Sequence, residues 1–331
     1  MSKSNDVLEN NARISARGDY TRWLLRRYDA LDIFEFEDDP PPVSLRDIFV
    51  PIYLSDEDTD DEKMDQETPL HEERAIGQNA WDCIVEHTFL ALSGRPGSGK
   101  TTPIKALIIE LCGQGLSRLR ERLVSNQGIL LIPLILRELP EIEAVETLDQ
   151  LVAAWLEREA DEAAHKDHPL DKLRLQQSIN PDGDNIPLLY LFDGLDKLGS
   201  NALREKVLLF AAEAVRRGHR VIVTGRPNGF QGLDFSKFPA LAGGIETKTT
   251  EQITTISSLA FLLGGLAHGL WRGEVIDSIG KTLILSQDMN GKIEQQLAKK
   301  QLQLRYLQPF AGPQILQFIE TWYQLRNEWK R

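Results

Sequence analysis

The chain has 331 residues, 41% of them hydrophobic and 27% charged, which is enough for a soluble protein with one large domain or two smaller ones. Its net charge of −12, without a visible basic patch, argues against a general nucleic-acid binder because an acidic surface repels phosphate backbones. The two cysteines, Cys83 and Cys112, match no metal-ligand spacing or disulfide framework, and the polar N-terminal residues lack a signal-peptide pattern, so we expect a cytoplasmic location.

Residues 1–55 are expected to form a helix and an extended arm. Apolar residues recur at helical spacing from Tyr20 to Leu31, which predicts a short amphipathic helix. The run Val43–Leu54 is bounded by prolines and looks extended at its end, so we expect it to pack as an arm on the main domain. Residues 56–75 follow as an acidic stretch without periodicity, and this composition is typical of a flexible linker.

Residues 76–240 alternate apolar strand candidates with helical segments, which predicts a parallel β-sheet covered by helices. Helical crossovers between the strands imply that the strands run parallel. The polar stretch from His165 to Asp184 predicts a surface excursion before the next strand. The expected strands are Phe89–Leu92, Ile129–Leu136, Leu188–Phe192 and Val221–Thr224, and the expected helices are Thr102–Leu111, Leu148–Ala164 and Ala202–Arg217.

A glycine-rich loop follows the first of these strands and matches G-x-x-x-x-G-K-[ST], the pattern of a phosphate-binding loop. Glycines let backbone N–H groups surround a phosphate, and the N-terminus of the following helix adds positive charge. Lys100 is expected to reach the β- and γ-phosphate oxygens, and the Thr101 hydroxyl to bind Mg²⁺. The pattern predicts a nucleoside triphosphate site, with a glycine turn that holds no ligand as the alternative. The predicted loop comprises Gly94, Arg95, Pro96, Gly97, Ser98, Gly99, Lys100, Thr101 and Thr102.

The strand Leu188–Phe192 is followed by Asp193-Gly-Leu-Asp196, which has the form of a Walker B motif. In a P-loop enzyme the strand beside the phosphate loop delivers such an aspartate to the Mg²⁺ shell, so Asp193 is the second expected metal ligand. Asp196 is expected to orient the attacking water or to act as its base. The alternatives are a turn aspartate at position 193 and a solvent-facing carboxylate at position 196.

The last strand of this region ends in Thr224-Gly-Arg226-Pro, at the edge of the sheet where open α/β proteins bind ligands. Arg226 is therefore expected to sense the γ-phosphate through a charge-assisted hydrogen bond that is lost after hydrolysis. A surface arginine in a turn is the alternative.

Residues 241–303 contain a strongly apolar stretch from Ile256 to Trp271. Glycines and a histidine interrupt it, and it is shorter than the roughly 18 to 20 uninterrupted apolar residues of a membrane-spanning helix. We therefore expect a buried or partner-facing helix and no transmembrane span.

Together, the loop at Gly94–Thr102, the segment Asp193–Asp196 and the segment Thr224–Pro227 resemble the NACHT group of STAND-class P-loop NTPases in their order and residue types. The stretch Leu307–Tyr323 is similar to the start of the helical domain that follows the nucleotide-binding core in that family. The stretch Tyr20–Leu54 is similar to a segment that often precedes the core in bacterial members.

The resemblance implies the fold class α/β, with a three-layer P-loop NTPase core and a mainly parallel sheet at residues 76–240. An insertion at residues 241–303 and the beginning of an α-helical domain at residues 304–331 would follow. The winged-helix region and sensor repeats common in the family do not follow before Arg331, so the resemblance implies a truncated member, one product of a split gene or a minimal NTPase module.

The resemblance also implies ATP as ligand, with GTP as the alternative, and slow Mg²⁺-dependent hydrolysis in which Lys100, Asp196 and Arg226 take part. A NACHT-type switch of this kind would act in bacterial defence signalling, through self-association or through sensor and effector proteins. Lys197 stands where the family usually has glutamate, which favours an alternative: a nucleotide-binding scaffold without significant turnover. A third hypothesis is an interaction protein that inserts Ile256–Trp271 into a membrane or a partner.

Overall fold

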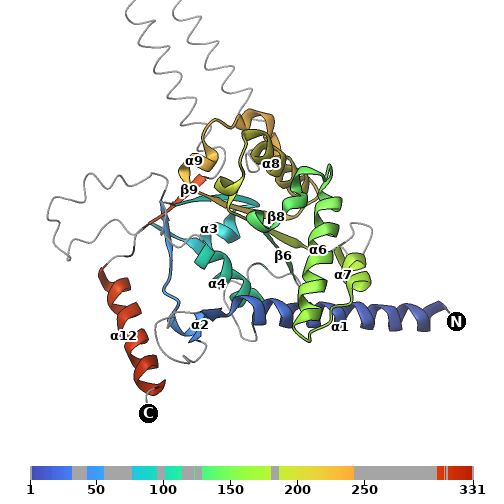
Figure 1. Ribbon diagram of the computed structural model, residues 1–331, viewed down its shortest axis with the longest axis horizontal. Coiled ribbons are helices and arrows are strands. Elements are labelled where there is room, and N and C mark those ends of the chain that lie inside the picture. Colours follow the sequence, from blue (N-terminus) through green and yellow to red (C-terminus); the bar gives the residue numbers. More distant parts are fainter. Residues whose placement is uncertain are drawn as a thin grey trace, which may run out of the picture.

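A seven-stranded β-sheet forms the centre of the protein (Figure 1). The computed structural model describes residues 2–31, 43–55, 77–94, 101–113, 123, 129–179, 186–241, 304–308, 310 and 312–329. Five strands run parallel in the order β9-β5-β8-β7-β6, whereas β3 runs antiparallel to both β9 and β4. The strands are β3 (Tyr53–Ser55), β4 (Gln78–Asn79), β5 (Phe89–Ser93), β6 (Leu130–Ile135), β7 (Leu188–Asp193), β8 (Arg220–Gly225) and β9 (Leu304–Leu307).

The four strands predicted from apolar runs, β5 to β8, are confirmed within two residues at each end. Every residue of β5, β6 and β7 is buried, because strands of a parallel sheet covered on both faces have no solvent-facing side. A separate pair, β1 (Ala30–Leu31) and β2 (Val43–Ser44), is antiparallel.

Helices lie on both faces of the sheet (Figure 1). The chain moves from β5 to β6 in one direction across the sheet and returns through β7 to β8, so right-handed crossovers place α4 and α8 on opposite faces. The predicted α/β architecture with a mostly parallel sheet is therefore confirmed. The helices are α1 (Ser2–Tyr28), α2 (Leu45–Ile48), α3 (Ala80–Glu86), α4 (Thr101–Cys112), α6 (Leu148–His165), α7 (Lys172–Ile179), α8 (Asn201–Arg216), α9 (Pro227–Phe230) and α12 (Gly312–Trp329).

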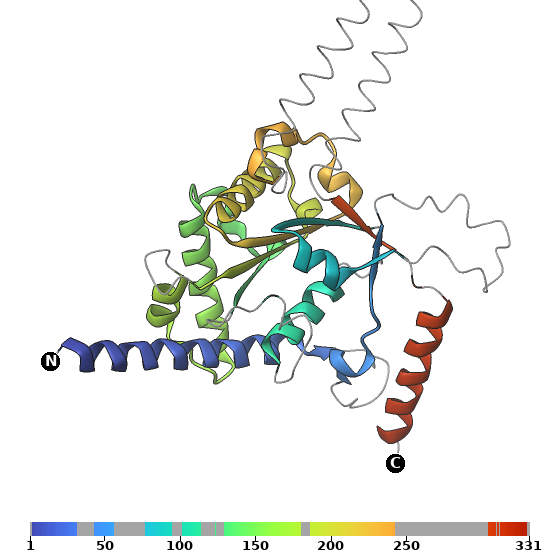
Figure 2. The same cartoon turned by 180° about the vertical axis from the view of Figure 1, so that it is seen from behind.

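Two predictions about helices are wrong. The stretch His165–Asp184 is not only a surface excursion, because it contains α7, which buries Leu175 and lies against α1. The N-terminal helix is not short: α1 has 27 residues and runs as a long rod across one side of the molecule (Figure 2). Its first half is polar and has no apolar periodicity, so the sequence pattern does not reveal it.

The predicted boundaries at residues 55 and 304 do not separate structural units. In the arm, β3 is a strand of the main sheet, with Leu54 opposite Leu307. The segment 304–331 does not begin with a helix: β9 pairs with β5 before α12 starts. A single cluster of buried residues joins these parts to the core, because apolar strands and helix faces distant in sequence share one interior; it includes Tyr20, Leu54, Leu107, Phe192 and Leu304.

The predicted linker at residues 56–75 and the apolar stretch Ile256–Trp271 lie outside the described residues. In the part of the chain that the structure describes, no helix combines the length and apolar character that a bilayer crossing demands.

Helix α1 contacts the outer edge of β6, the last strand of the sheet. The Leu130 backbone N–H donates to Pro187 O, toward β7, so the backbone groups of Leu131 and Pro133 face outward. Proline is tolerated there because an outward position needs no ladder hydrogen bond. The Tyr20 hydroxyl of α1 donates to the outward-facing carbonyl of Leu131 at 2.7 Å. A side chain therefore supplies the hydrogen bond that a neighbouring strand would otherwise give to this carbonyl.

Replacing Tyr20 by phenylalanine is expected to lower the free energy of unfolding by about 1 kcal/mol, because it leaves the buried Leu131 carbonyl without its donor. Urea unfolding followed by circular dichroism measures the change. Tyr323→Phe is the matched control, since that ring is 52% exposed. Equal midpoints for the Tyr20 variant and the wild type would contradict the edge-capping role.

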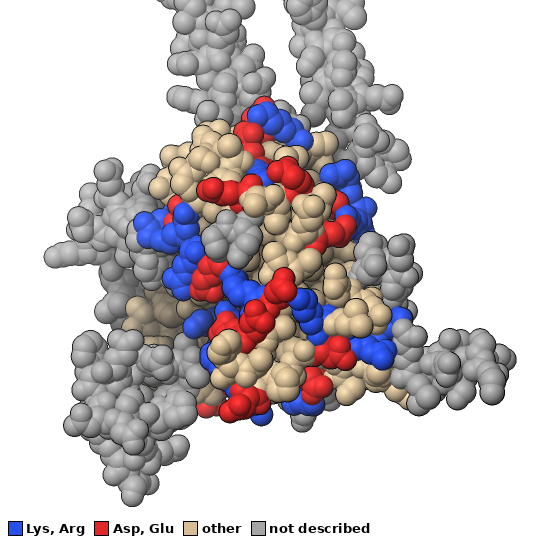
Figure 3. Space-filling model, turned by 45° about the vertical axis from the view of Figure 1, so that its right-hand side comes forward, with Lys and Arg blue, Asp and Glu red and all other residues tan. Residues whose placement is uncertain are grey.

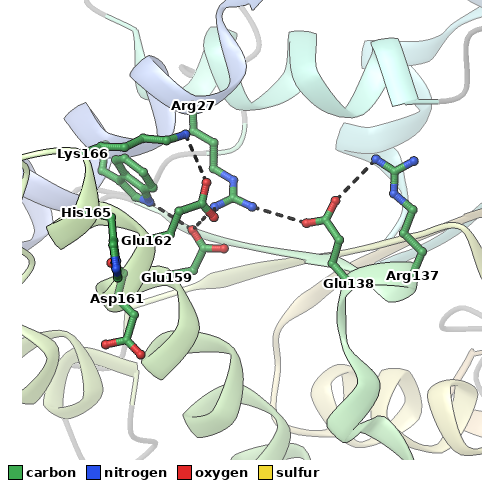
Figure 4. A network of polar contacts seen from close by, with 9 residues as sticks. Arg27, Arg137, Glu138, Glu159, Asp161, Glu162, His165 and Lys166 are labelled. Atoms are coloured by element: carbon green, nitrogen blue, oxygen red, sulfur yellow. Dashed lines mark hydrogen bonds and ion pairs between the residues drawn. The ribbon is translucent and has the colours of Figure 1, made fainter.

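A buried polar network fastens α1 to α6 (Figure 4). The Glu159 side chain is 1% exposed and accepts hydrogen bonds from Trp23 Nε1 at 3.0 Å and from Arg27 Nη1 at 3.2 Å. Arg27 also pairs with Glu162 and, at 3.4 Å, with Glu138. Burial raises the pKa of Glu159, although the Arg27 guanidinium acts in the opposite direction. Arg27 is thus the cation that compensates a buried carboxylate.

Candidate functional site

The carboxyl ends of three adjacent strands, β5, β8 and β7, meet at one edge of the sheet. Ser93 of β5 lies opposite Gly225 of β8, and Phe192 of β7 lies opposite Val223. The Gly94 N–H donates to Gly225 O at 3.2 Å, which joins the start of the predicted phosphate loop to the end of β8. The expectation that Asp193 comes from the strand beside the loop is wrong, because β8 lies between β5 and β7. Crossover geometry, rather than chain order, decides which strands are neighbours.

The predicted phosphate loop is described only at its ends. Gly94 follows β5, and Thr101 and Thr102 begin α4, as predicted, whereas Arg95, Pro96, Gly97, Ser98, Gly99 and Lys100 lie outside the described residues. The positive end of the α4 dipole therefore lies at this edge of the sheet, which favours an anion there.

Asp193 is the centre of a hydrogen-bonded chain across this edge. Its side chain is buried, and its Oδ2 accepts from the Thr101 hydroxyl at 3.1 Å. Its Oδ1 accepts from the Thr224 hydroxyl. The Thr224 hydroxyl in turn accepts from the Gly194 N–H at 3.1 Å. Two hydroxyl groups from different elements therefore hold one carboxylate in place.

Thr224 was not among the predicted site residues, although its hydroxyl at the end of β8 was a visible signal. The contact with Asp193 depends on strand order, which brings the ends of β7 and β8 together. Gly194 adopts φ +90°, a left-handed conformation that residues with a Cβ rarely adopt. This turn directs its N–H at Thr224 and starts the 3₁₀ helix η4 (Leu195–Lys197).

Asp196 and Arg226, which were predicted to act on water and phosphate, contact each other. The Asp196 side chain is 4% exposed, and its Oδ2 lies 3.2 Å from Arg226 Nε. Its Oδ1 accepts from the Arg226 backbone N–H at 3.0 Å. The Lys197 Nζ lies 3.9 Å from the same Oδ2. Asp196 is therefore a paired carboxylate and not a solvent-facing one.

Tight packing keeps α9 against η4 and so fixes this pair. A Cβ on Gly229 would lie 2.9 Å from Asp196 N, closer than ordinary contacts allow. The Arg204 guanidinium donates to Leu198 O at 3.3 Å and to Asn228 O at 3.2 Å, which ties the end of η4 to α9. Packing and hydrogen bonds therefore hold the backbone around Asp196 and Arg226 in one arrangement.

The donor atoms around Asp193 fit Mg²⁺. A carboxylate and the Thr101 hydroxyl are hard oxygen ligands, and Mg²⁺ characteristically combines one or two such protein groups with substrate phosphates and water. Among the described residues, no group of three or more His, Cys, Asp or Glu side chains is arranged to hold a metal ion by itself.

Comparison with known proteins gives no family. A scan against models of protein families finds no match for this chain, and neither does a search of curated proteins.

Charged side chains of both signs are mixed on the face shown in Figure 3. Lys and Arg are interspersed with Asp and Glu over this face and do not gather into one basic surface. It lacks the continuous positive charge that attracts a nucleic-acid backbone.

Proposed function

We propose that the chain binds a nucleoside triphosphate with Mg²⁺, ATP with GTP as the alternative, and hydrolyses it slowly as a NACHT-type signalling switch. The observation that carries this proposal is the Asp193 carboxylate, held between the Thr101 hydroxyl at the start of α4 and the Thr224 hydroxyl at the end of β8. A hydroxyl and a carboxylate beside a helix N-terminus suit a cation that accompanies phosphate groups.

The phosphates and Mg²⁺ would be bound by different residues of the motifs. Lys100 and the backbone of residues 94–102 would bind the phosphates, and Thr101 and Asp193 would hold Mg²⁺. Mg²⁺, when bound, neutralises negative charge on the phosphate oxygens. Arg226 directly follows β8, the strand between β5 and β7, and its guanidinium would donate to a γ-phosphate. Asp196 is the group that pairs with this guanidinium.

On the NACHT resemblance we extend the proposal to a cytoplasmic role in bacterial defence signalling. Self-association, or sensor and effector proteins, would be the partners. Bound triphosphate and bound diphosphate would then favour different conformations, because the γ-phosphate would contact protein groups that a diphosphate cannot reach.

Titration with fluorescently labelled ATP and Mg²⁺ tests the proposal. Lys100→Ala is expected to weaken binding about 10- to 100-fold, since it removes a charge-assisted hydrogen bond to phosphate. Lys105→Ala is the matched control, because this partly buried lysine lies on α4, five residues later in the sequence and outside the motif. Equally poor binding by the wild type and Lys100→Ala would overturn the proposal.

A scaffold that binds nucleotide without turnover is the second candidate. It is favoured by the Asp196 carboxylate, which is already paired with Arg226 and next to Lys197, so it is not free to take a proton from water. Phosphate release decides between the two: clear turnover that Asp193→Ala abolishes excludes the scaffold, and binding without release supports it.

A further inference from the structure

Asp196 is a buried carboxylate with two cations near one of its oxygens. Arg226 Nε lies 3.2 Å and Lys197 Nζ 3.9 Å from Oδ2, while the carboxylate itself is 4% exposed. The other oxygen, Oδ1, accepts from the Arg226 backbone N–H. Arg226 alone can compensate the charge of this carboxylate, which leaves the Lys197 amino group available for a further role.

The two cations differ in how they are attached. The Arg226 backbone is tied to Asp196, but its side chain is 38% exposed, so the guanidinium can turn away while the backbone stays in place. The Lys197 backbone is fixed by its N–H, which donates to Gly194 O at 2.9 Å, and its side chain is 47% exposed. A flexible lysine stem lets Nζ approach Oδ2 further without any change in the backbone.

If the Arg226 guanidinium moves away from Asp196, the negative charge of this buried carboxylate loses its cation. A buried carboxylate that loses the cation paired with it is strongly destabilising, since its lost hydration is no longer compensated. Arg226 can therefore turn toward a phosphate at low cost only when another cation replaces it. In the described part of the chain, Lys197 is the side chain whose amino group lies near enough to the same oxygen.

We propose that Lys197 is a positioning residue that takes over the Asp196 carboxylate when Arg226 moves to the γ-phosphate of a bound triphosphate. This inference rests on the proposed function. Lys197 and Arg226 would then alternate as the cationic partner of Asp196. The exchange favours triphosphate over diphosphate, because only a γ-phosphate draws Arg226 away.

Nucleotide selectivity tests the exchange directly. Dissociation constants are measured for a slowly hydrolysed ATP analogue and for ADP, each with Mg²⁺. Lys197→Met is expected to raise the dissociation constant of the analogue about tenfold, which is the scale of one charged hydrogen bond. The dissociation constant of ADP is expected to change by no more than about twofold. Lys197→Arg restores the positive charge and is expected to recover the wild-type ratio. Lys237→Met is the matched control, since Lys237 is an exposed lysine paired with Glu205 at 3.1 Å.

The outcomes separate this inference from the proposed function. If the wild type binds neither nucleotide, the proposed function is overturned and the exchange falls with it. If the wild type binds both and Lys197→Met changes neither affinity, or both equally, only the exchange is overturned.

Thermal unfolding without nucleotide supplies a second, independent measurement. Arg226→Met alone is expected to lower the melting temperature slightly, because Lys197 compensates Asp196. In a chain that already carries Lys197→Met, Arg226→Met is expected to lower the melting temperature by about 2–4 °C more than it does in the wild type. Adding Asp196→Asn is expected to make the effect of Arg226→Met equal in the two backgrounds. Additive effects of the two substitutions would overturn the takeover of Asp196 by Lys197.

Discussion

Changing Asp193 to asparagine is expected to abolish the Mg²⁺-dependent part of nucleotide binding and to reduce any turnover by about a hundredfold or more. The substitution keeps the shape of the side chain but removes its charge. The Thr101 and Thr224 hydroxyls then face an amide that attracts a divalent cation much less. Binding of labelled ATP with Mg²⁺ or with EDTA, and phosphate release, measure the two effects.

Two further variants show whether the effect belongs to this carboxylate. Thr224→Val is expected to give a smaller loss, because Asp193 keeps its charge and the Thr101 contact but loses one hydroxyl that holds it. Asp171→Asn, at an exposed position before α7, is expected to behave like the wild type. A full Mg²⁺ dependence in Asp193→Asn would show that the cation is held elsewhere.

Replacing Arg27 by methionine is expected to lower the free energy of unfolding by about 3–5 kcal/mol at neutral pH, because it leaves the buried Glu159 carboxylate without its cation. Chemical denaturation measures the loss. Arg22→Met is the control, since Arg22 lies on the same helix and its side chain is 63% exposed. Arg27→Met combined with Glu159→Gln is expected to recover much of the stability, because the unpaired charge is gone. No recovery would contradict the role of charge compensation.

The loss from Arg27→Met is expected to depend on pH. The Glu159 pKa is raised by burial above the ordinary 4.5, so the folded state binds this proton more tightly than the unfolded state. Stability from this group is therefore present at low pH and falls as pH rises from the unfolded pKa through the folded one. Removing Arg27 raises the folded pKa further. Denaturation at about pH 5 should then show a smaller loss than at about pH 7.5, and the reverse order would contradict the assignment.

Much of the fold was predictable because apolar runs determine which segments are buried. Phe89–Leu92 and Leu188–Phe192 are apolar throughout, and such runs form strands when helices cover both faces of a sheet. Helix α7 was missed because its eight residues are too short to show clear periodicity, and its burial depends on contact with α1. The role of β9 was missed because a four-residue strand next to β5 depends on a partner more than two hundred residues earlier.

The sequence by itself determined the chemistry that can gather at the edge of the sheet: a carboxylate at Asp193, a hydroxyl at Thr101 and a guanidinium at Arg226, each directly after an apolar strand or at the start of a helix. Only the tertiary structure decided their partners. The position of β8 between β5 and β7 brings Thr224 to Asp193, and the packing of α9 on η4 brings Arg226 to Asp196. The reason is physical: local sequence selects strands and turns, whereas side-chain partners across a sheet depend on strand order and crossover direction, which contacts distant in sequence determine.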